Sequence, residues 1–334
     1  MEPALLHGGN LDAARQLFPD APQPFIDLST GINPHSYPVP PLSPDLFARL
    51  PEPAALGRLA AIAANAYGAP SRQHVVAASG TQILLPQVGA LVPPGRAAVL
   101  GPTYAEFSRA AALAGHDVSE VGEIDQLTDA DLAVVVNPNN PDGRIFAKRE
   151  LIDLANARRH RGGMLIVDEA FMDVGPAGAS LCGEIARGDI VVLRSFGKFF
   201  GLGGLRLGFA LAAPQISARL AAALGPWAVS GPAIAVGQVA LADAAWADAM
   251  RRRLDGEARL LDDLLVEAGM EVVGGTSLFR LARMSLANRM FHHLGRAGIL
   301  ARRFPEHDAW LRFGIPGSAA AWNRLRAALI AFPG

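Results

Sequence analysis

The feature that most constrains the fold is a regular alternation of short, β-branched apolar segments with alanine-rich segments of helical spacing. The apolar segments are residues 74–79 (HVVAAS), 97–101 (AAVLG), 132–138 (LAVVVNP), 164–170 (MLIVDEA) and 189–196 (DIVVLRSF). Nearly continuous apolar runs of this length are typical of strands that are buried on both faces. Strands of this kind joined by helices form a parallel sheet between two helical layers. The sequence therefore predicts an α/β domain.

Two further parts are predicted outside the alternating region. The first forty residues are rich in proline, glycine and polar turn formers, so we expect residues 1–40 to be an extended arm that packs with a smaller domain or a partner subunit. Residues 41–225 contain the alternating pattern of the large domain. From Gly225 onward the pattern changes to a long alanine-rich helix over about 231–268, several apolar segments and a last helix near 319–331. Residues 226–334 therefore predict a smaller α+β domain.

Charge and cysteine content exclude several classes of function. Lysine and arginine number 30 against 31 aspartates and glutamates, without a basic stripe, so we expect no binding to nucleic acid or to an anionic membrane. No apolar segment reaches transmembrane length, and the first residues, MEPALLHGGN, lack a signal-peptide pattern. The single cysteine, Cys182, predicts a buried thiol in a reducing compartment, and no metal-ligand spacing occurs. We expect a cytoplasmic protein that binds no metal.

Polar residues follow several of the predicted strands, at the sheet edge where open α/β proteins bind their ligands. Ser79-Gly80-Thr81 comes after one strand and opens a helix, which fits either a phosphate site or a simple N-cap. Tyr104 follows the next strand and could either stack on a ligand or pack inside the domain. Residues 137–143 (NPNNPDG) predict a fixed turn, because the two Asn-Pro steps restrict the backbone.

Asp168 and Lys198 are the most unusual of these residues. Asp168 and Glu169 end a buried strand, where a carboxylate is costly unless a positive group meets it; helix N-capping is the alternative role. Lys198 follows another strand and lies in the glycine-rich segment SFGKFFGLGGLRLGF. A lysine amine that is partly desolvated loses its proton more easily and becomes a nucleophile toward carbonyl groups, with which it forms a Schiff base.

The glycine-rich segment does not predict a nucleotide site. GLGGLRLG does not fit GxGxxG in register, and GKFF lacks the serine or threonine that follows the lysine of a Walker loop. Ser195 and Arg206, three residues before and eight after Lys198, could instead bind a dianion beside the amine.

Taken as an ordered set, these residues resemble the fold-type I, pyridoxal-phosphate-dependent enzymes of the class I and II aminotransferase family. The resemblance extends from the arm to Arg312. It implies that Lys198 binds the cofactor covalently, that Asp168 pairs with the pyridinium nitrogen, that Asn140 hydrogen-bonds the 3-oxygen and that Tyr104 stacks on the ring. The residues implied to bind the cofactor phosphate are Gly80, Thr81, Ser195 and Arg206.

Two positions depart from the pattern of this family. A tyrosine that bonds the 3-oxygen is often found three residues after the aspartate, but here the residue is Phe171. A Tyr-Pro-Asp-Pro segment, whose tyrosine reaches the cofactor phosphate of the neighbouring subunit, is replaced by Leu50-Pro-Glu-Pro53. The resemblance still implies a homodimer, although the sequence offers no replacement for these two hydroxyl groups.

Within this family, the segments HGGN (7–10), IDLSTGINP (26–34) and DEAFMD (168–173) resemble the threonine-phosphate decarboxylases of cobalamin biosynthesis. These enzymes are related to histidinol-phosphate aminotransferases, and both groups bind a phosphorylated substrate. Arg312, in WLRFG, would bind the substrate carboxylate, and Arg302 would bind its phosphate, with the adjacent Arg303 as the alternative. The other residues implied to bind substrate are His7, Gly8, Gly9 and Asn33, although a Gly-Gly pair near a terminus is commonly flexible.

The resemblance implies decarboxylation of L-threonine O-3-phosphate to (R)-1-amino-2-propanol O-2-phosphate. The same residue types could remove the α-proton and support transamination, so an aminotransferase of the histidinol-phosphate type is the alternative. A regulator that uses this fold as a sensor is a third possibility, but such proteins usually carry an additional DNA-binding domain, for which 334 residues leave no room.

Overall fold

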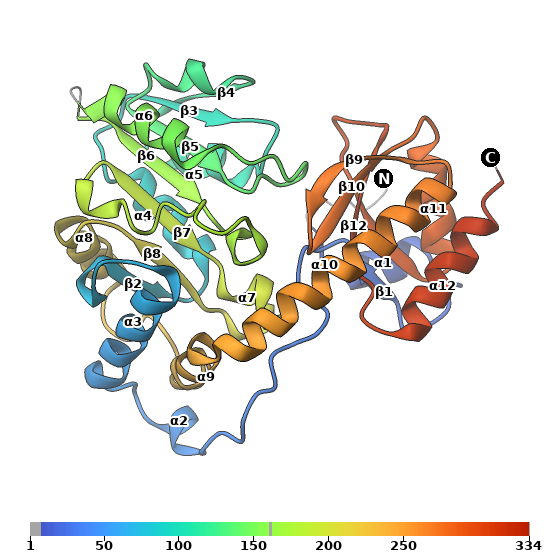
Figure 1. Cartoon of the computed structure of the whole chain (residues 1–334), viewed down its shortest axis with the longest axis horizontal. Helices are drawn as coiled ribbons and strands as arrows, with labels where there is room; N and C mark the ends of the chain where they lie inside the picture. Colours follow the sequence, from blue (N-terminus) through green and yellow to red (C-terminus); the bar gives the residue numbers. More distant parts are fainter. Residues whose placement is uncertain (1–7, 160–161, 334) are drawn as a thin grey trace. The chain divides into compact units, whose positions relative to one another are not determined.

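The sheet expected from the strand–helix alternation is present in the computed structural model, which describes residues 8–159 and 162–333 (Figure 1). It belongs to a large unit made of residues Tyr37–Asn140 and Arg144–Trp246. Its strands, in spatial order, are β2 (Val75–Ala78), β8 (Gly208–Leu211), β7 (Ile190–Arg194), β6 (Met164–Asp168), β5 (Leu132–Val136), β3 (Arg96–Leu100) and β4 (Asp117–Val121). Each segment that the sequence predicted as a strand is therefore found.

Strand β8 is the exception to the parallel arrangement, because it pairs antiparallel with both β7 and β2. The other neighbouring pairs are parallel. The connection from β7 to β8 contains only the short helix α7 (Phe196–Phe199) and the 3-10 turn η6 (Gly203–Leu205). A parallel return normally requires a longer crossover, usually a helix, whereas an antiparallel return does not. The fold is therefore α/β with a mostly parallel central sheet.

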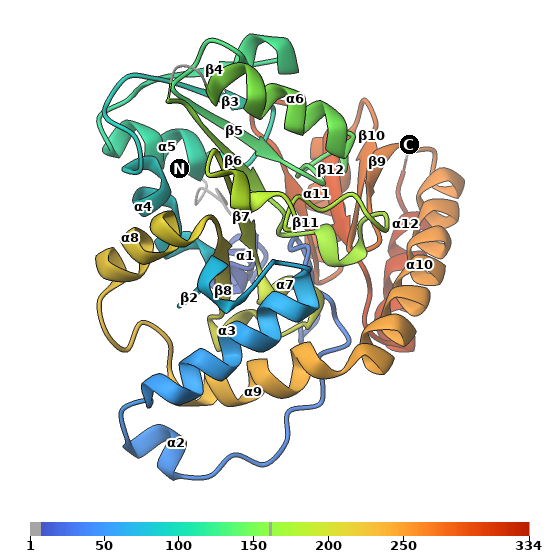
Figure 2. The ribbon, with the colours of Figure 1, turned by 60° about the vertical axis from the view of Figure 1, so that its left-hand side comes forward.

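Helices cover the sheet of the large unit. Their bounds are α2 (Asp45–Ala48), α3 (Pro53–Tyr67), α4 (Leu85–Gly89), α5 (Glu106–Leu113), α6 (Lys148–Arg159), α8 (Pro214–Leu224) and α9 (Gly231–Ala242). Side chains of α4, α5 and α8 share one apolar core with the strands. Helices α3 and α9 lie side by side (Figure 2). Among the described residues, no helix is both long and apolar enough to cross a bilayer.

The single long helix expected over about 231–268 is wrong, because Asp243 separates α9 from α10 (Ala244–Glu267). The carboxylate of Asp243 accepts a hydrogen bond from the backbone N–H of Trp246 at 3.0 Å and one from the hydroxyl of Tyr37 at 3.1 Å. A side chain that binds a nearby backbone N–H competes with the helix and favours a new helix start. The large unit also ends here, at Trp246, so residues 226–246 pack with it and not with the smaller domain.

The small unit comprises residues 8–36, 141–143 and 247–333 of the described chain. Its sheet has the order β1 (Ile26–Leu28), β11 (Ile299–Arg303), β12 (Trp310–Gly314), β10 (Phe279–Arg283) and β9 (Glu271–Thr276). The helices that complete its core are α1 (Leu11–Leu17), α10, α11 (Ala287–Arg296) and α12 (Ala319–Ile330).

The expectation of an extended arm without compact elements is wrong for its first part. Helix α1 lies there, and β1 pairs in parallel with β11. Phe18, Phe25 and Leu28 are buried in the core of the small unit. Burial of these apolar side chains offsets the entropy lost when the segment becomes ordered. Residues 31–44 contain no helix or strand, as the sequence suggested.

Candidate functional site

The carboxyl ends of β6 and β7 bring the predicted catalytic pair into one region of the large unit. The two strands are parallel neighbours, with Asp168 opposite Leu193. Asp168 ends β6 and is buried, and its carboxylate accepts a hydrogen bond from the backbone N–H of Ala170 at 3.0 Å. Lys198 lies in α7, which follows β7 after Ser195, and its side chain is half-buried.

Burial is the largest influence on the Asp168 carboxyl and raises its pKa to about 7. The Ala170 N–H and the Lys198 ammonium lower this pKa in part, as does the Arg194 guanidinium, whereas Glu169 raises it further. A buried acid with a cation near it can ionise when a second positive group arrives. A protonated ring nitrogen is one group of that kind.

Phe171, the position where the sequence lacks the tyrosine of related proteins, faces the amine of Lys198. The Nζ atom lies 5.6 Å from the centroid of the Phe171 ring. The phenyl ring offers a cation–π contact and apolar surface but no hydrogen-bond donor. The structure therefore places an apolar ring beside the amine, as the absence of a tyrosine at this position implied.

Gly80, Thr81 and Arg206 lie together beside β2 and β8. Gly80 has a φ of 85°, and a Cβ atom built on it would lie 2.6 Å from Nη2 of Arg206. A Cβ atom on Gly208 would likewise lie 2.6 Å from the backbone N of Thr81. Only glycine allows this close approach of the guanidinium to the backbone of the turn. Positive charge next to backbone N–H groups is suited to binding a phosphate.

Ser195 is the N-cap residue of α7, and its side chain makes no capping hydrogen bond to that helix. Its position, between the end of β7 and Lys198, agrees with a role in binding an external group. Arg206 has a φ of 56°, which is uncommon for a residue other than glycine and is often found at functional sites.

Tyr104 is held by a residue whose role the sequence did not reveal. Its hydroxyl donates a hydrogen bond to Oε1 of Gln82 at 3.0 Å, and Gln82 follows Thr81 directly. The Tyr104 ring also packs edge-on against Phe107. The structure thus joins Tyr104 to the turn at Gly80–Thr81. No sequence signal pointed to Gln82, because its partner is 22 residues away.

The turn at residues 137–143 is fixed by the side chains of Asn137 and Asn139. Asn137 exchanges hydrogen bonds with the backbone of Phe146, and Asn139 binds the carbonyl of Pro102 and the hydroxyl of Thr103. Both asparagines are therefore structural. Asn140, the half-buried residue that follows them, is the one predicted to contact the cofactor.

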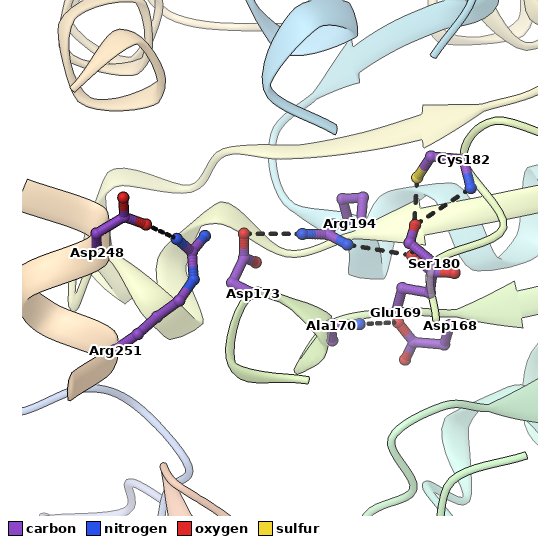
Figure 3. Close-up of polar contacts among 9 residues, drawn as sticks. All are labelled: Asp168, Glu169, Ala170, Asp173, Ser180, Cys182, Arg194, Asp248 and Arg251. Atoms are coloured by element: carbon purple, nitrogen blue, oxygen red, sulfur yellow. Dashed lines mark hydrogen bonds and ion pairs between the residues drawn. The ribbon is translucent and has the colours of Figure 1, made fainter. Parts of the chain in front are cut away.

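Glu169 does not cap a helix as the sequence alternative suggested. It forms a buried ion pair with Arg194, the last residue of β7, at 3.1 Å (Figure 3). No local sequence pattern indicates a partner for either residue of this pair. The two are 25 residues apart, and only the pairing of β6 with β7 joins them.

In the small unit, Gly8 and Gly9 pack against the end of β1. A Cβ atom on Gly8 would collide with the carbonyl oxygen of Ser29, and the Gly9 N–H donates to the Ser29 hydroxyl at 2.8 Å. The same Ser29 carbonyl accepts a hydrogen bond from Arg312 at 2.7 Å. The Gly-Gly segment is therefore held beside Arg312. His7 lies outside the described residues.

Arg302 and Arg312 are directly opposite each other on β11 and β12. Opposite residues of an antiparallel pair project from the same face, so two cations are brought together there. Burial and the nearby Arg302 lower the pKa of Arg312 to about 9, which Asp27 partly opposes. Like charges placed this way are destabilising unless an anion lies between them.

Arg303 points to the other face of β11. It donates to Asn288 at 3.2 Å and lies over the Phe291 ring at 4.7 Å, and both partners belong to α11. The register therefore separates two arginines that the sequence could not distinguish. Asn33 is fully buried, and its side chain accepts from the backbone N–H of His35 at 2.9 Å.

The large unit thus contains a half-buried amine, a buried acid and a turn with an arginine beside it. Pyridoxal phosphate requires an amine for its aldehyde, an acid for its ring nitrogen and a cationic cradle for its phosphate. Lys198, Asp168 and the Gly80–Arg206 pair supply these groups. The residues present therefore fit this cofactor.

The sequence matches the family described as aminotransferase class I and II over residues 52–329. It is 41% identical to a threonine-phosphate decarboxylase of Pseudomonas aeruginosa over 331 residues, which cover 98% of each chain. It is 38% identical to a threonine-phosphate decarboxylase of Sinorhizobium sp. over 335 residues, again 98% of each chain.

Among solved structures, the fold is similar to that of a histidinol-phosphate aminotransferase from Sinorhizobium meliloti in complex with pyridoxal-5'-phosphate. The TM-score is 0.80, with 95% of this chain and 92% of the other chain covered. Sequence identity is 18%, so this likeness concerns the fold alone.

Proposed function

This chain belongs to the class I and II aminotransferase family, and from that premise we propose that it is a pyridoxal-phosphate-dependent decarboxylase of L-threonine O-3-phosphate. The observation that carries the choice of reaction is the identity of 41% to a threonine-phosphate decarboxylase along 98% of both chains. The product would be (R)-1-amino-2-propanol O-2-phosphate, for use in cobalamin biosynthesis.

The large unit is assigned to the cofactor. Lys198 would hold the cofactor covalently, and Asp168 would accept a hydrogen bond from its ring N–H. Asn140 would bind the 3-oxygen, and Tyr104 would stack on the ring. The phosphate would be bound by Gly80, Thr81, Ser195 and Arg206. When bound, pyridoxal phosphate condenses with a substrate amine and accepts the electron pair left on the α-carbon when a bond to that carbon breaks.

Each of these residues has a defined task. Ionised Asp168 keeps a proton on the ring nitrogen, which increases the electron demand of the ring. The Nζ atom of Lys198 would hold the proton that the α-carbon of the substrate takes up. Phe171 places an apolar ring 5.6 Å from Nζ and offers it no hydrogen-bond partner.

The small unit is assigned to the anionic groups of the substrate. Arg312 would bind the carboxylate and Arg302 the phosphate, because the two guanidinium groups lie on one face of the β11–β12 pair. Gly8, Gly9 and Asn33 would contribute further donors to these anions. A substrate fixed at two points has a fixed rotation about its bonds to the α-carbon, and this rotation selects which bond breaks.

Release of carbon dioxide from the substrate tests the proposed reaction. The purified chain, loaded with pyridoxal phosphate, should release carbon dioxide from L-threonine O-3-phosphate, and Lys198→Ala should abolish the release. The chain contains two lysines, so Lys148→Ala is a matched control; Lys148 forms an ion pair with Glu184 at 3.0 Å and should be dispensable. Borohydride should attach the cofactor at Lys198 and not at Lys148.

The alternative is an aminotransferase that acts on histidinol phosphate, as the name of the similar solved structure suggests for that protein. Addition of histidinol phosphate would then convert the bound cofactor to its amine form, which is visible as a loss of absorbance in the visible range. Rapid amino transfer without carbon dioxide release from threonine phosphate would replace the proposal by this alternative.

We further propose that the chain forms a homodimer through the segment that precedes α3. Val39, Phe47 and Leu50 are 46%, 69% and 66% exposed in this short stretch of the large unit. Exposed large apolar side chains are common at contacts between subunits. We expect a second copy of this chain to cover them.

A further inference from the structure

A buried network of one cation and two anions lies next to Asp168. The Nη1 atom of Arg194 is 3.1 Å from Oε2 of Glu169, and its Nη2 atom is 2.8 Å from Oδ1 of Asp173 (Figure 3). The side chains of all three residues are at most 6% exposed. Two carboxylates and one guanidinium leave the network with a formal charge of −1.

Further contacts hold Glu169 and Arg194 in place. Glu169 also accepts hydrogen bonds from the Ser180 hydroxyl at 2.6 Å and from the Leu181 N–H at 2.7 Å. The guanidinium carbon of Arg194 lies 4.3 Å from the centroid of the Tyr67 ring, which belongs to α3. These contacts fix the orientation of both Glu169 and Arg194.

Stability alone does not account for this network. Replacement of a buried ion pair by apolar side chains of similar size is often neutral or stabilising, because desolvation offsets most of the Coulomb attraction. The first four residues of β6 and of β7 are all apolar and buried, and they already supply a core. The placement of the charges is therefore more informative than their contribution to the free energy of folding.

The network joins the strand ends that carry Asp168 and Lys198. Glu169 follows Asp168 directly, and its N–H donates to the Leu193 carbonyl at 2.9 Å. Arg194 follows Leu193 and is separated from Lys198 by three residues. The ion pair between Glu169 and Arg194 thus fixes β6 to β7 at the level of the reacting groups.

We propose that Arg194 is a positioning residue that binds Glu169 and Asp173 together, fixes Asp168 relative to Lys198 and offsets the negative charge beside Asp168. This inference rests on the function proposed above, in which Asp168 must be ionised to hold a proton on the ring nitrogen. Arg194 itself contacts neither the substrate nor the cofactor in this role.

The charged groups around Asp168 shift its pKa in opposite directions. Glu169 raises the pKa of Asp168, whereas Arg194 and Lys198 lower it. The charged or titratable groups around Arg194 are Asp173, Cys182, Glu169 and Tyr67. Removal of the cation and removal of the anion should therefore shift the titration of Asp168 in opposite directions. A purely structural pair would give the same loss of order in both variants.

The experiment measures the titration of the Asp168 carboxyl carbon by NMR in full-length, cofactor-free protein labelled with [4-¹³C]aspartate. The signal is assigned by its loss in Asp168→Asn. Arg194→Met should move the titration midpoint up by about one pH unit, and Glu169→Gln should move it down by a similar amount. Arg194→Lys, which keeps the charge, should restore a midpoint close to that of the wild type.

A control and a second variant keep the test decisive. Arg280→Met removes a guanidinium from its ion pair with Asp262 in the small unit and should leave Asp168 unchanged. If Arg194→Met does not fold, Arg194→Met/Asp173→Asn removes one buried carboxylate together with the cation, and a smaller upward shift is expected because Glu169 then lacks its cation. Shifts in one direction for both charge removals, or none in folded variants, would overturn the proposal.

The same measurement is independent of the proposed function. The titration requires no cofactor, so its outcome tests the role of Arg194 even in a protein that proves not to be a decarboxylase. Binding of pyridoxal phosphate to the wild-type protein, followed by its visible absorbance, tests the proposed function separately.

Discussion

Substitution of Asp168 by asparagine should stabilise the cofactor-free protein while it removes activity. Asp168 is 8% exposed, and burial raises its pKa from the ordinary value of 3.8 to about 7. The unfolded chain loses this proton near pH 4 and the folded chain near pH 7. Between these values the folded protein binds one more proton, so the free energy of unfolding falls as the pH rises.

The size of this effect follows from the rise in pKa. A rise of about three pH units corresponds to about 4 kcal/mol of stability lost by the time the pH exceeds 7. An amide at this position cannot ionise and can still accept the hydrogen bond from the Ala170 N–H. Near pH 8, Asp168→Asn should therefore raise the free energy of unfolding by up to about 4 kcal/mol, and near pH 4 it should change little.

Urea unfolding of the cofactor-free protein at several pH values measures this difference. Asp12→Asn is a suitable control, because the Asp12 carboxylate is 88% exposed and its replacement should have no comparable pH dependence. A difference between wild type and Asp168→Asn that stays constant from pH 4 to about pH 8 would refute the reasoning. So would a variant that is less stable than the wild type at high pH. Loss of carbon dioxide release in the same variant would show that the destabilising acid serves the reaction.

Three further predictions concern the two binding regions and the dimer. Arg302→Gln should raise the KM for L-threonine O-3-phosphate by about tenfold or more, whereas Arg303→Gln, on the face toward α11, should change it by less than about threefold. Gly80→Ala should weaken binding of pyridoxal phosphate by about tenfold or more in a fluorescence titration, because φ is 85° and the new Cβ atom would displace Arg206. Phe47→Glu should convert the expected dimer to a monomer in sedimentation experiments, and an unchanged mass would remove Phe47 from the interface.

Several features of the site could be read from local sequence. Asp168 and Lys198 each follow a continuous apolar run, and strands of that kind lie in a parallel sheet whose carboxyl ends share one edge. The turn at residues 137–143 was also predictable, because proline restricts the residue before it.

Other features depended on contacts between residues far apart in the chain. The break between α9 and α10 at Asp243 depends in part on Tyr37, which is 206 residues away. The ordered structure of the first described residues depends on the core of the small unit, in which Phe18 and Phe25 are buried. The role of Gln82 depends on Tyr104.

By itself, the sequence determined the α/β class, the sheet edge that carries the reactive groups and the chemical identity of the amine and the acid. The pairing of strands places Arg302, and not Arg303, opposite Arg312 and brings Glu169 to Arg194. The physical reason is that side chains alternate between the two faces of a strand, so a shift of one residue in register exchanges them. Register is set by the pairing of strands, and no local sequence pattern determines it.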